Sequence, residues 1–266
     1  MHPPMARTGS FLVLCALALS GCASAPPASP TALPTLPPSP TPTVAFPTLI
    51  PTSTVTPPAS PTASPELAAG AGSLLFQAAF TTDEGWLLSS DADGAASLSR
   101  ESLVIAVSRP NASRFVLVPI PPTADFLLEA TIRANLCDPE DEIGLLFRVS
   151  PQADHYRFTL SCGGVARMTR VLGSSAALVA GPADASSAIP GSPVENRLTV
   201  VGRGQVFTFF VNGVEVLQSH DSQLLSGGFA FFVRSASQGQ TTAALTSLTV
   251  RALLPDASAT LTPAPG

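Results

Sequence analysis

The sequence predicts an all-β domain, an antiparallel β-sandwich, over residues 72–253. Three observations support this prediction. Apolar and β-branched runs in this segment are short, Gly, Pro, Asn and Asp interrupt them at steady spacing, and no run has the periodicity of an amphipathic helix. About twelve short strands in ~180 residues are typical of one sandwich rather than of two domains.

Twelve segments fit strands of this kind. In one of them Leu128, Ala130 and Ile132 share a face and polar residues occupy the other, as in a half-buried strand. The expected strands cover residues 74–80, 102–107, 114–118, 126–135, 143–149, 156–161, 165–171, 197–201, 205–211, 214–218, 228–234 and 245–252.

The clearest turn signal is Asn212-Gly213, which separates two apolar runs. Asn and Gly tolerate the positive φ angles of a type I′ turn, so the sequence predicts a two-residue β-hairpin here. Asp91-Ala92-Asp93-Gly94 matches part of a calcium loop, but we expect a simple turn.

Residues 1–21 have the pattern of a secretory signal peptide. Arg7 precedes an uncharged apolar core, Phe11 to Leu19, that is too short to span a bilayer. The core ends in Leu-Ser-Gly-Cys22, which resembles the bacterial lipoprotein signal. The resemblance implies that Cys22 is lipid-modified and anchors the mature protein to a cell membrane, facing outside the cytoplasm at the cell surface or in the periplasm. An ordinary secreted protein cut near Ala23-Ser24-Ala25 is the alternative.

Residues 22–71 predict a disordered tether, and residues 254–266 a similar disordered tail. The stretch from Ala23 to Pro65 has no charged residue and is rich in Pro, Ser, Thr and Ala, so it cannot bury a core. Repeated Pro favours polyproline II at about 3.1 Å per residue, and these 43 residues would reach ~130 Å at most. A stalk that lifts the domain away from the membrane is expected, and an interdomain linker is the alternative.

Charge excludes several function classes. All 13 basic residues are Arg and none is Lys, which excludes lysine nucleophiles, Schiff bases and P-loop chemistry. The formal net charge is −5 and no basic run occurs, so we expect no nucleic-acid partner.

The order of several short segments resembles the concanavalin-A-like lectin/glucanase superfamily, and most closely its laminin-G-like and keto-disaccharide-hydrolase-like branches. The resemblance extends over Leu74 to Ala252 and implies a jelly-roll sandwich; by itself this fold does not determine a function. It rests on Phe80 followed by Asp83-Glu84-Gly85-Trp86, Glu142 to Arg148, His155 to Phe158, Asn196-Arg197-Leu198, Phe210 to Gly213 and Gly227 to Ala230.

The cysteines fit an exported protein. Cys15 leaves with the signal peptide and Cys22 takes the lipid, which leaves Cys137 and Cys162 in the domain. Outside the cytoplasm two such thiols usually pair, so we expect a disulfide that stabilises the fold by roughly 3 kcal/mol. Two buried free thiols are the alternative.

The candidate ligand-binding residues are Trp86, His155, Tyr156 and Arg157. Sugar-binding faces expose Trp or Tyr, and this chain has one of each. Trp86 follows a Gly in an early turn, where a cap on the core is the favoured role and a stacking platform the alternative. The His155-Tyr156-Arg157 segment is the better surface candidate, with Tyr156 inside the sheet as its alternative.

The acidic segment that follows Cys137 allows three interpretations: a solvated turn, which we favour, a calcium site and a glycosidase pair. Calcium prefers carboxylate oxygens, but the regular ligand spacing of a dedicated loop is missing. Family 16 glucanases share only the two-residue step, and Pro139 interrupts the run where a central strand would continue. We therefore expect no catalytic residue here. The candidate calcium ligands are Asp138, Glu140, Asp141 and Glu142.

Together these observations predict a lipid-anchored envelope protein that presents a non-catalytic sandwich for binding or scaffolding. The expected partner is a glycan or another protein. We expect no cofactor, and calcium is the one candidate. A glycoside-processing hydrolase of the same fold is the alternative.

Overall fold

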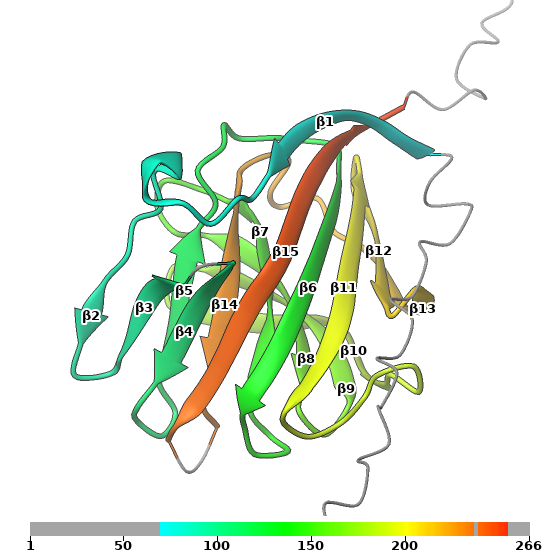
Figure 1. Ribbon diagram of the computed structural model, residues 1–266. Coiled ribbons are helices and arrows are strands. Elements are labelled where there is room, and N and C mark those ends of the chain that lie inside the picture. Colours follow the sequence, from blue (N-terminus) through cyan, green and yellow to red (C-terminus); the bar gives the residue numbers. More distant parts are fainter. Residues whose placement is uncertain (1–69, 100, 237–238, 255–266) are drawn as a thin grey trace, which may run out of the picture. The chain divides into compact units, whose positions relative to one another are not determined.

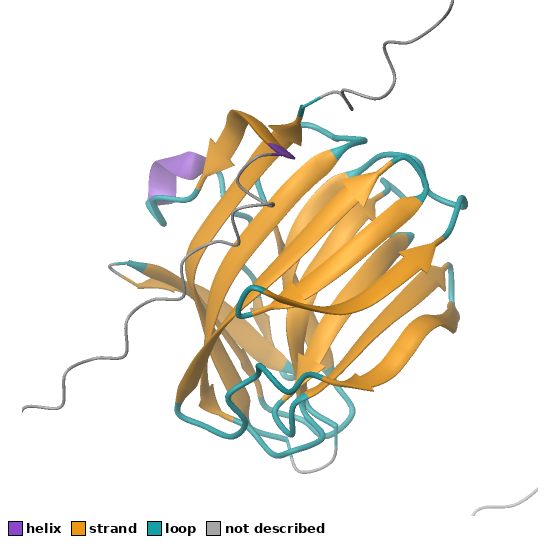
Figure 2. Ribbon diagram, turned by 90° about the vertical axis from the view of Figure 1, so that its right-hand side faces the viewer, coloured by secondary structure: helices purple, strands orange, loops and turns teal. Residues whose placement is uncertain are grey.

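The computed structural model describes residues 70–99, 101–236 and 239–254. The predicted signal peptide and Cys22, nearly all of the tether, and all but one residue of the tail lie outside these residues. The described chain forms two antiparallel β-sheets that pack face to face, as Figures 1 and 2 show from two directions. None of its helices has the length and apolar character needed to cross a membrane.

The larger sheet has nine strands in the order β13-β12-β11-β6-β15-β4-β3-β2, with β1 paired to β15. Its long central strands β6, β11 and β15 cross the front of Figure 1. The strands are β1 (Ala71–Gln77), β2 (Ser90–Asp91), β3 (Gly94–Ser99), β4 (Ser102–Val107), β6 (Phe126–Leu136), β11 (Val194–Arg203), β12 (Val206–Val211), β13 (Val214–His220) and β15 (Thr241–Leu253).

The smaller sheet has six strands in the order β10-β9-β8-β7-β14-β5. A short 3-10 helix, η1 (Thr82–Glu84), lies between β1 and β2. The strands are β5 (Ser113–Leu117), β7 (Glu142–Val149), β8 (His155–Ser161), β9 (Val165–Leu172), β10 (Ser175–Asp184) and β14 (Gly228–Arg234).

The predicted all-β sandwich is confirmed, and each of the twelve expected strands overlaps one in the structure. The Asn212-Gly213 hairpin joins β12 to β13 with φ angles of 50° and 83°. Three strands escaped prediction: β2, β3 and β10. β10 is rich in Ala and largely exposed along the sheet edge, so its sequence carries no alternation between apolar and polar residues.

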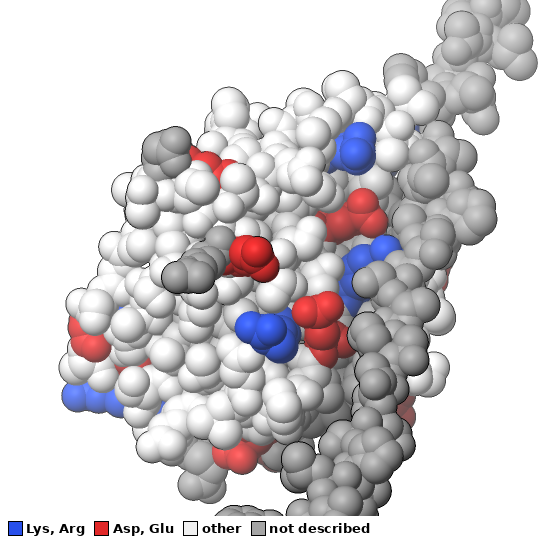
Figure 3. Space-filling model, viewed as in Figure 1, with Lys and Arg blue, Asp and Glu red and all other residues white. Residues whose placement is uncertain are grey.

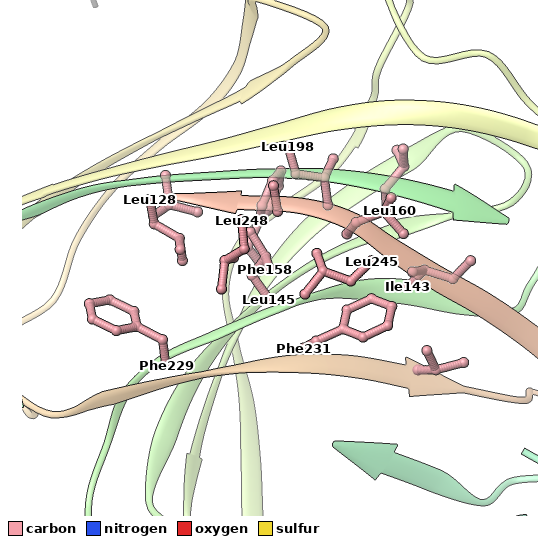
Figure 4. Close-up of a cluster of buried hydrophobic side chains, with 14 of the residues drawn as sticks. Leu128, Ile143, Leu145, Phe158, Leu160, Leu198, Phe229, Phe231, Leu245 and Leu248 are labelled. Carbon is pink, nitrogen blue, oxygen red and sulfur yellow. The ribbon is translucent and has the colours of Figure 1, made fainter. Parts of the chain in front are cut away.

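The core fills the space between the two sheets. Alternate positions of the facing strands supply large apolar side chains, as the close-up in Figure 4 shows for Leu128, Leu145, Phe158, Phe231 and Leu245. Burial of this kind contributes about 25 cal/mol per Å² of apolar surface removed from water. The alternation leaves the opposite faces of both sheets outside the core.

Cys137 and Cys162 form a disulfide in the structure, with a sequence separation of 25. Buried Asp141 organises the same corner, because its carboxylate accepts hydrogen bonds from the backbone N–H of Asp138 and of Ala236, each at 2.8 Å, and from the hydroxyl of Thr241 at 2.7 Å. These contacts fasten the start of β7 to the connection between β14 and β15.

Polar contacts link the two sheets at both open edges of the sandwich. At one edge, Arg114 of β5 donates to the Ser89 hydroxyl at 2.7 Å and pairs with Asp91 of β2. At the other edge, the Tyr156 hydroxyl donates to Asp221 at 2.5 Å and accepts the backbone N–H of Leu224 at 3.0 Å. The smaller and the larger sheet are therefore joined by hydrogen bonds as well as by the core.

One end of the sandwich is organised around Arg148, whose side chain is fully buried. Its guanidinium donates to the carbonyl of Leu224 at 2.7 Å, of Ala124 at 3.0 Å and of Gly204 at 2.6 Å. It also lies over the ring of Phe207, 4.6 Å from the centroid. Three separate connections between strands are thus tied to one cation.

Replacing Arg148 should destabilise the whole domain. Arg148→Met keeps an apolar stem over Phe207 but removes every donor to the three carbonyl groups, so the free energy of unfolding should fall by about 3 kcal/mol. Chemical denaturation followed by tryptophan fluorescence measures this change. Arg109→Met is the matched control, because the Arg109 side chain is 62% exposed, and it should change stability by less than about 0.5 kcal/mol. Equal stability of the two variants would contradict the assigned role.

Tyr156 gives a second test, since it is the only tyrosine in the chain. Burial and the hydrogen bond to Asp221 raise the pKa of Tyr156 to about 12, against about 10 in an unfolded chain. A group with a raised pKa stabilises the fold below its unfolded value, and that contribution disappears as the pH rises from about 10 to about 12. Tyrosinate absorbance should titrate near the higher value in the folded protein and near the lower value in denaturant. A single ordinary midpoint in the folded protein would contradict the buried arrangement.

Candidate functional site

The outer face of the smaller sheet brings together charged side chains from neighbouring strands. In the ladder, Glu142 of β7 stands opposite Arg234 of β14 on one side and Ser161 of β8 on the other. Arg167 follows on β9, the next strand. Directly opposed residues share a face of a sheet, so strand order places these side chains together.

Glu142 is the centre of this cluster. Its side chain is only 3% exposed. Arg167 Nη1 lies 3.0 Å from its Oε1, and Arg234 Nη1 lies 3.2 Å from its Oε2. Both arginine side chains are about one-third exposed. Each carboxylate oxygen therefore lies within ion-pair distance of a guanidinium, and Arg234 also donates a hydrogen bond to Glu142. A nearly buried carboxylate requires such partners.

Arg157 of β8 adds a third cation to the same face. Its guanidinium lies over the ring of Phe232, 4.8 Å from the centroid. Beneath it, Leu146, Ala230 and Phe232 form a small buried apolar cluster, with Val149 packed against them. The Arg157 Nε is buried and has no hydrogen-bond partner among the described residues.

The charges of the cluster act on one another. Burial lowers the pKa of Arg157, Glu142 opposes this effect, and Arg234 and Arg167 add to it. Arginine remains protonated at physiological pH all the same.

An open depression of about 550 Å³ borders the cluster, and β5 continues the same face with Phe115 and Leu117 exposed. The face thus combines hydrogen-bonding groups with an exposed apolar strip. The depression is lined by Asn111, Pro139, Glu140, Glu142, Ser161, Gly163, Val165, Arg167, Arg234 and Ala236.

Two other hollows lie elsewhere on the described domain. A comparable depression of about 520 Å³ includes Glu101, Arg133 and Glu195 and lies by the outer face of the larger sheet, where Figure 3 shows charges of both signs scattered among uncharged side chains. A third hollow, next to Cys162, holds only about 20 Å³, which is little more than one water molecule needs.

The structure places Trp86 in the core rather than on a binding face. Its side chain is 8% exposed, it stacks on Phe80 with ring centroids 6.0 Å apart, and its indole N–H donates to Glu84 at 2.9 Å. Both the ring and its polar atom therefore have partners inside the domain. This position matches the favoured interpretation of Trp86 as a cap.

The His155-Tyr156-Arg157 segment divides between the two faces of β8. Tyr156 points inward and is fully buried, so it offers no stacking surface. His155 is half-buried, with Nδ1 at 2.7 Å from the Ala153 carbonyl, and burial lowers its pKa. Arg157 points outward into the charged cluster.

The acidic segment does not assemble a site. Asp141 is committed to its three hydrogen bonds and Glu142 to its two arginines, while Glu140 is exposed at the rim of the depression. Among the residues that the structure describes, no three His, Cys, Asp or Glu side chains are arranged to hold a metal ion. The candidate calcium ligands Asp138, Glu140, Asp141 and Glu142 are therefore not gathered as one metal site among the described residues.

Sequence reasoning missed Arg167, Arg234 and the pairing of Glu142. The alternation of Arg167 with buried Ala166 and Met168 was a usable signal, because it marks an outward-facing position. Nothing local indicated that β14 would lie beside β7.

Comparison with known proteins shows the fold alone. No model of a known protein family matches the sequence, and no curated protein matches it either. A Bacillus subtilis protein of unknown function with a galectin-like fold is similar in structure, with a TM-score of 0.53, 12% identity, and coverage of 69% of this chain and 98% of that one. The VIP36 exoplasmic/lumenal domain, in its Ca²⁺/Man3GlcNAc-bound form, has a TM-score of 0.51 and 10% identity, and the match covers 64% of this chain and 84% of that one. The carbohydrate-binding module CBM66 from Bacillus subtilis has a TM-score of 0.49 and 18% identity, and the match covers 63% of this chain and 96% of that one. The described domain therefore has a galectin-like β-sandwich fold, which confirms the jelly-roll expectation.

Proposed function

We propose that this chain is a glycan-binding lipoprotein of a bacterial cell envelope. In this proposal the outer face of the smaller sheet binds the saccharide without catalysis. A lipid on Cys22 holds the chain at the membrane, and the segment from Ala23 to Pro65 acts as the stalk.

The observation that carries the proposal is that hydrogen-bonding groups around an open depression and two exposed apolar side chains of the edge strand β5 share one face of the smaller sheet. Saccharides present hydroxyl groups at their edges and C–H surfaces on their ring faces, so they need both kinds of contact. Arg167, Arg234 and Ser161 supply the first kind, and Phe115 and Leu117 the second.

The rigidity of the cluster supports binding at this place. Its polar side chains come from central strands of the sheet, and two of them are held by the ion pairs to Glu142. A preorganised site loses less conformational entropy when the ligand binds. Saccharides make weak individual contacts, so this saving matters for them.

The fold adds support of a coarser kind. The VIP36 domain, whose structure is similar, was solved with Man3GlcNAc bound. A non-catalytic role for the present chain is supported by the state of Asp141 and Glu142, since hydrolysis by the usual route needs two carboxyl groups free to act on the glycosidic bond.

A glycan array tests the binding role. We expect the full-length chain, in detergent, to be retained on at least one class of saccharide, with or without added calcium. Arg167→Ala should weaken that retention about tenfold, because it removes a charged donor from the depression and frees Glu142 on one side.

Arg133→Ala is the matched control for this array, because Arg133 is an exposed arginine on the outer face of the larger sheet. It should leave retention unchanged. Absence of retention on every saccharide, or equal loss in both variants, would contradict the proposed function.

Membrane fractionation tests the anchor. We expect the wild-type chain to sediment with membranes and to incorporate labelled fatty acid, because two or three acyl chains hold a protein firmly. Cys22→Ala should appear in the soluble fraction without label, whereas Cys15→Ala, within the apolar core of the signal, should behave as wild type. A Cys22→Ala protein that still sediments with membranes would contradict a lipid anchor at Cys22.

A further inference from the structure

Both carboxylate oxygens of Glu142, the central acceptor of the charged cluster, already have an arginine partner, whereas the arginines have further N–H donors. Each oxygen of Glu142 already receives one arginine Nη1. Arginine carries five N–H donors, and the described residues offer Arg167 and Arg234 no acceptor besides Glu142. A ligand that enters the depression therefore meets more donors than acceptors.

Arg157 strengthens this imbalance. No oxygen of the described residues accepts a hydrogen bond from its guanidinium, although burial already removes part of it from water. It lies over the ring of Phe232, 4.8 Å from the centroid, on the outer face of the sheet. A planar guanidinium held in this way matches the two oxygens of a carboxylate.

The charge of this face points in the same direction. The side chains that line the depression are balanced, with Arg167 and Arg234 against Glu140 and Glu142. Exposed Asp184 stands opposite Val165 at the edge of this face. The excess of cations is local, since Arg157, Arg167 and Arg234 surround the one carboxylate of Glu142. The depression by the larger sheet has Arg133 against Glu101 and Glu195, which leaves one negative charge. The cluster around Glu142 therefore has an excess of cations that the depression by the larger sheet lacks.

We propose that the saccharide bound on this face is acidic, and that its carboxylate is received by Arg157 together with the N–H groups of Arg167 and Arg234 that do not contact Glu142. This inference rests on the proposed glycan-binding function and specifies its ligand as a glycan with uronic acid residues. The sugar ring beside the carboxylate then lies toward the apolar strip of Phe115 and Leu117.

The experiment compares one saccharide in two charge states. Oligosaccharides of galacturonic acid and their methyl esters have the same sugar skeleton, but only the free acid is anionic. Titration calorimetry with the full-length chain in detergent should show the acid binding at least tenfold more tightly than the ester, because a charged hydrogen-bond partner is lost on esterification.

Three variants locate the effect. Arg157→Gln should weaken binding of the acid about tenfold and barely change binding of the ester. Arg157→Lys should also weaken binding of the acid, since lysine keeps the charge but not the planar fork. Glu140→Gln should strengthen binding of the acid about twofold, because it removes from the rim an exposed negative charge that repels the carboxylate of the ligand.

The controls distinguish failure of this inference from failure of the proposed glycan-binding function. Arg133→Gln, on the opposite face, should leave every affinity unchanged, and thermal unfolding should show that each variant is folded. Equal binding of acid and ester, or equally tight binding of inorganic polyphosphate, would overturn the carboxylate assignment and leave glycan binding in place. Equal losses in Arg133→Gln and Arg157→Gln would also overturn it, while failure to bind any saccharide would remove both proposals.

Discussion

The rest of the structure depends on the burial of one guanidinium, that of Arg148. Strand β7 bulges there, because Gly228 pairs with Val149 and Phe229 with Phe147, so Arg148 has no opposite residue on β14. The bulge gives Arg148 a φ of 53° and directs its side chain into the end of the sandwich. A buried cation needs acceptors, and three backbone carbonyls from separate connections supply them. Because their carbonyls accept hydrogen bonds from Arg148, the three connections are held in position relative to β7.

This constraint also sets the geometry of the candidate site. β7 is held at one end by Arg148 and at the other by the hydrogen bonds of Asp141. Between these anchors the register cannot slip, since a shift of one residue would turn Glu142 toward the core and Ile143 toward solvent. Groups that do not touch the depression thus determine where Glu142 meets its arginines.

The parts of this design differ in how far the sequence predicts them. Alternation and turn residues predicted most strands and the Asn212-Gly213 hairpin, because both signals are local. β3 and β10 lacked apolar contrast, and both were missed. Arg157 was found from the polarity around it, but the pairing of Glu142 with Arg234 was not, because β14 reaches β7 across a long stretch of chain. Tyr156 is buried with its hydroxyl donated to Asp221, a partner that composition alone cannot reveal.

The arrangement of buried and exposed charge determines which groups of the cluster a ligand meets first, although Glu142 lies at its centre. Glu142 is 3% exposed while its two arginines extend further into solvent, so a ligand meets guanidinium groups before it meets the carboxylate. The apolar cluster of Leu146, Ala230 and Phe232 beneath Arg157 excludes water and lowers the local dielectric, so each charged contact is stronger there than on an open surface. Stacking on Phe232 and pairing with Glu142 orient the donors during folding. Binding therefore does not have to order them, and a weakly interacting saccharide can use nearly all of their attraction.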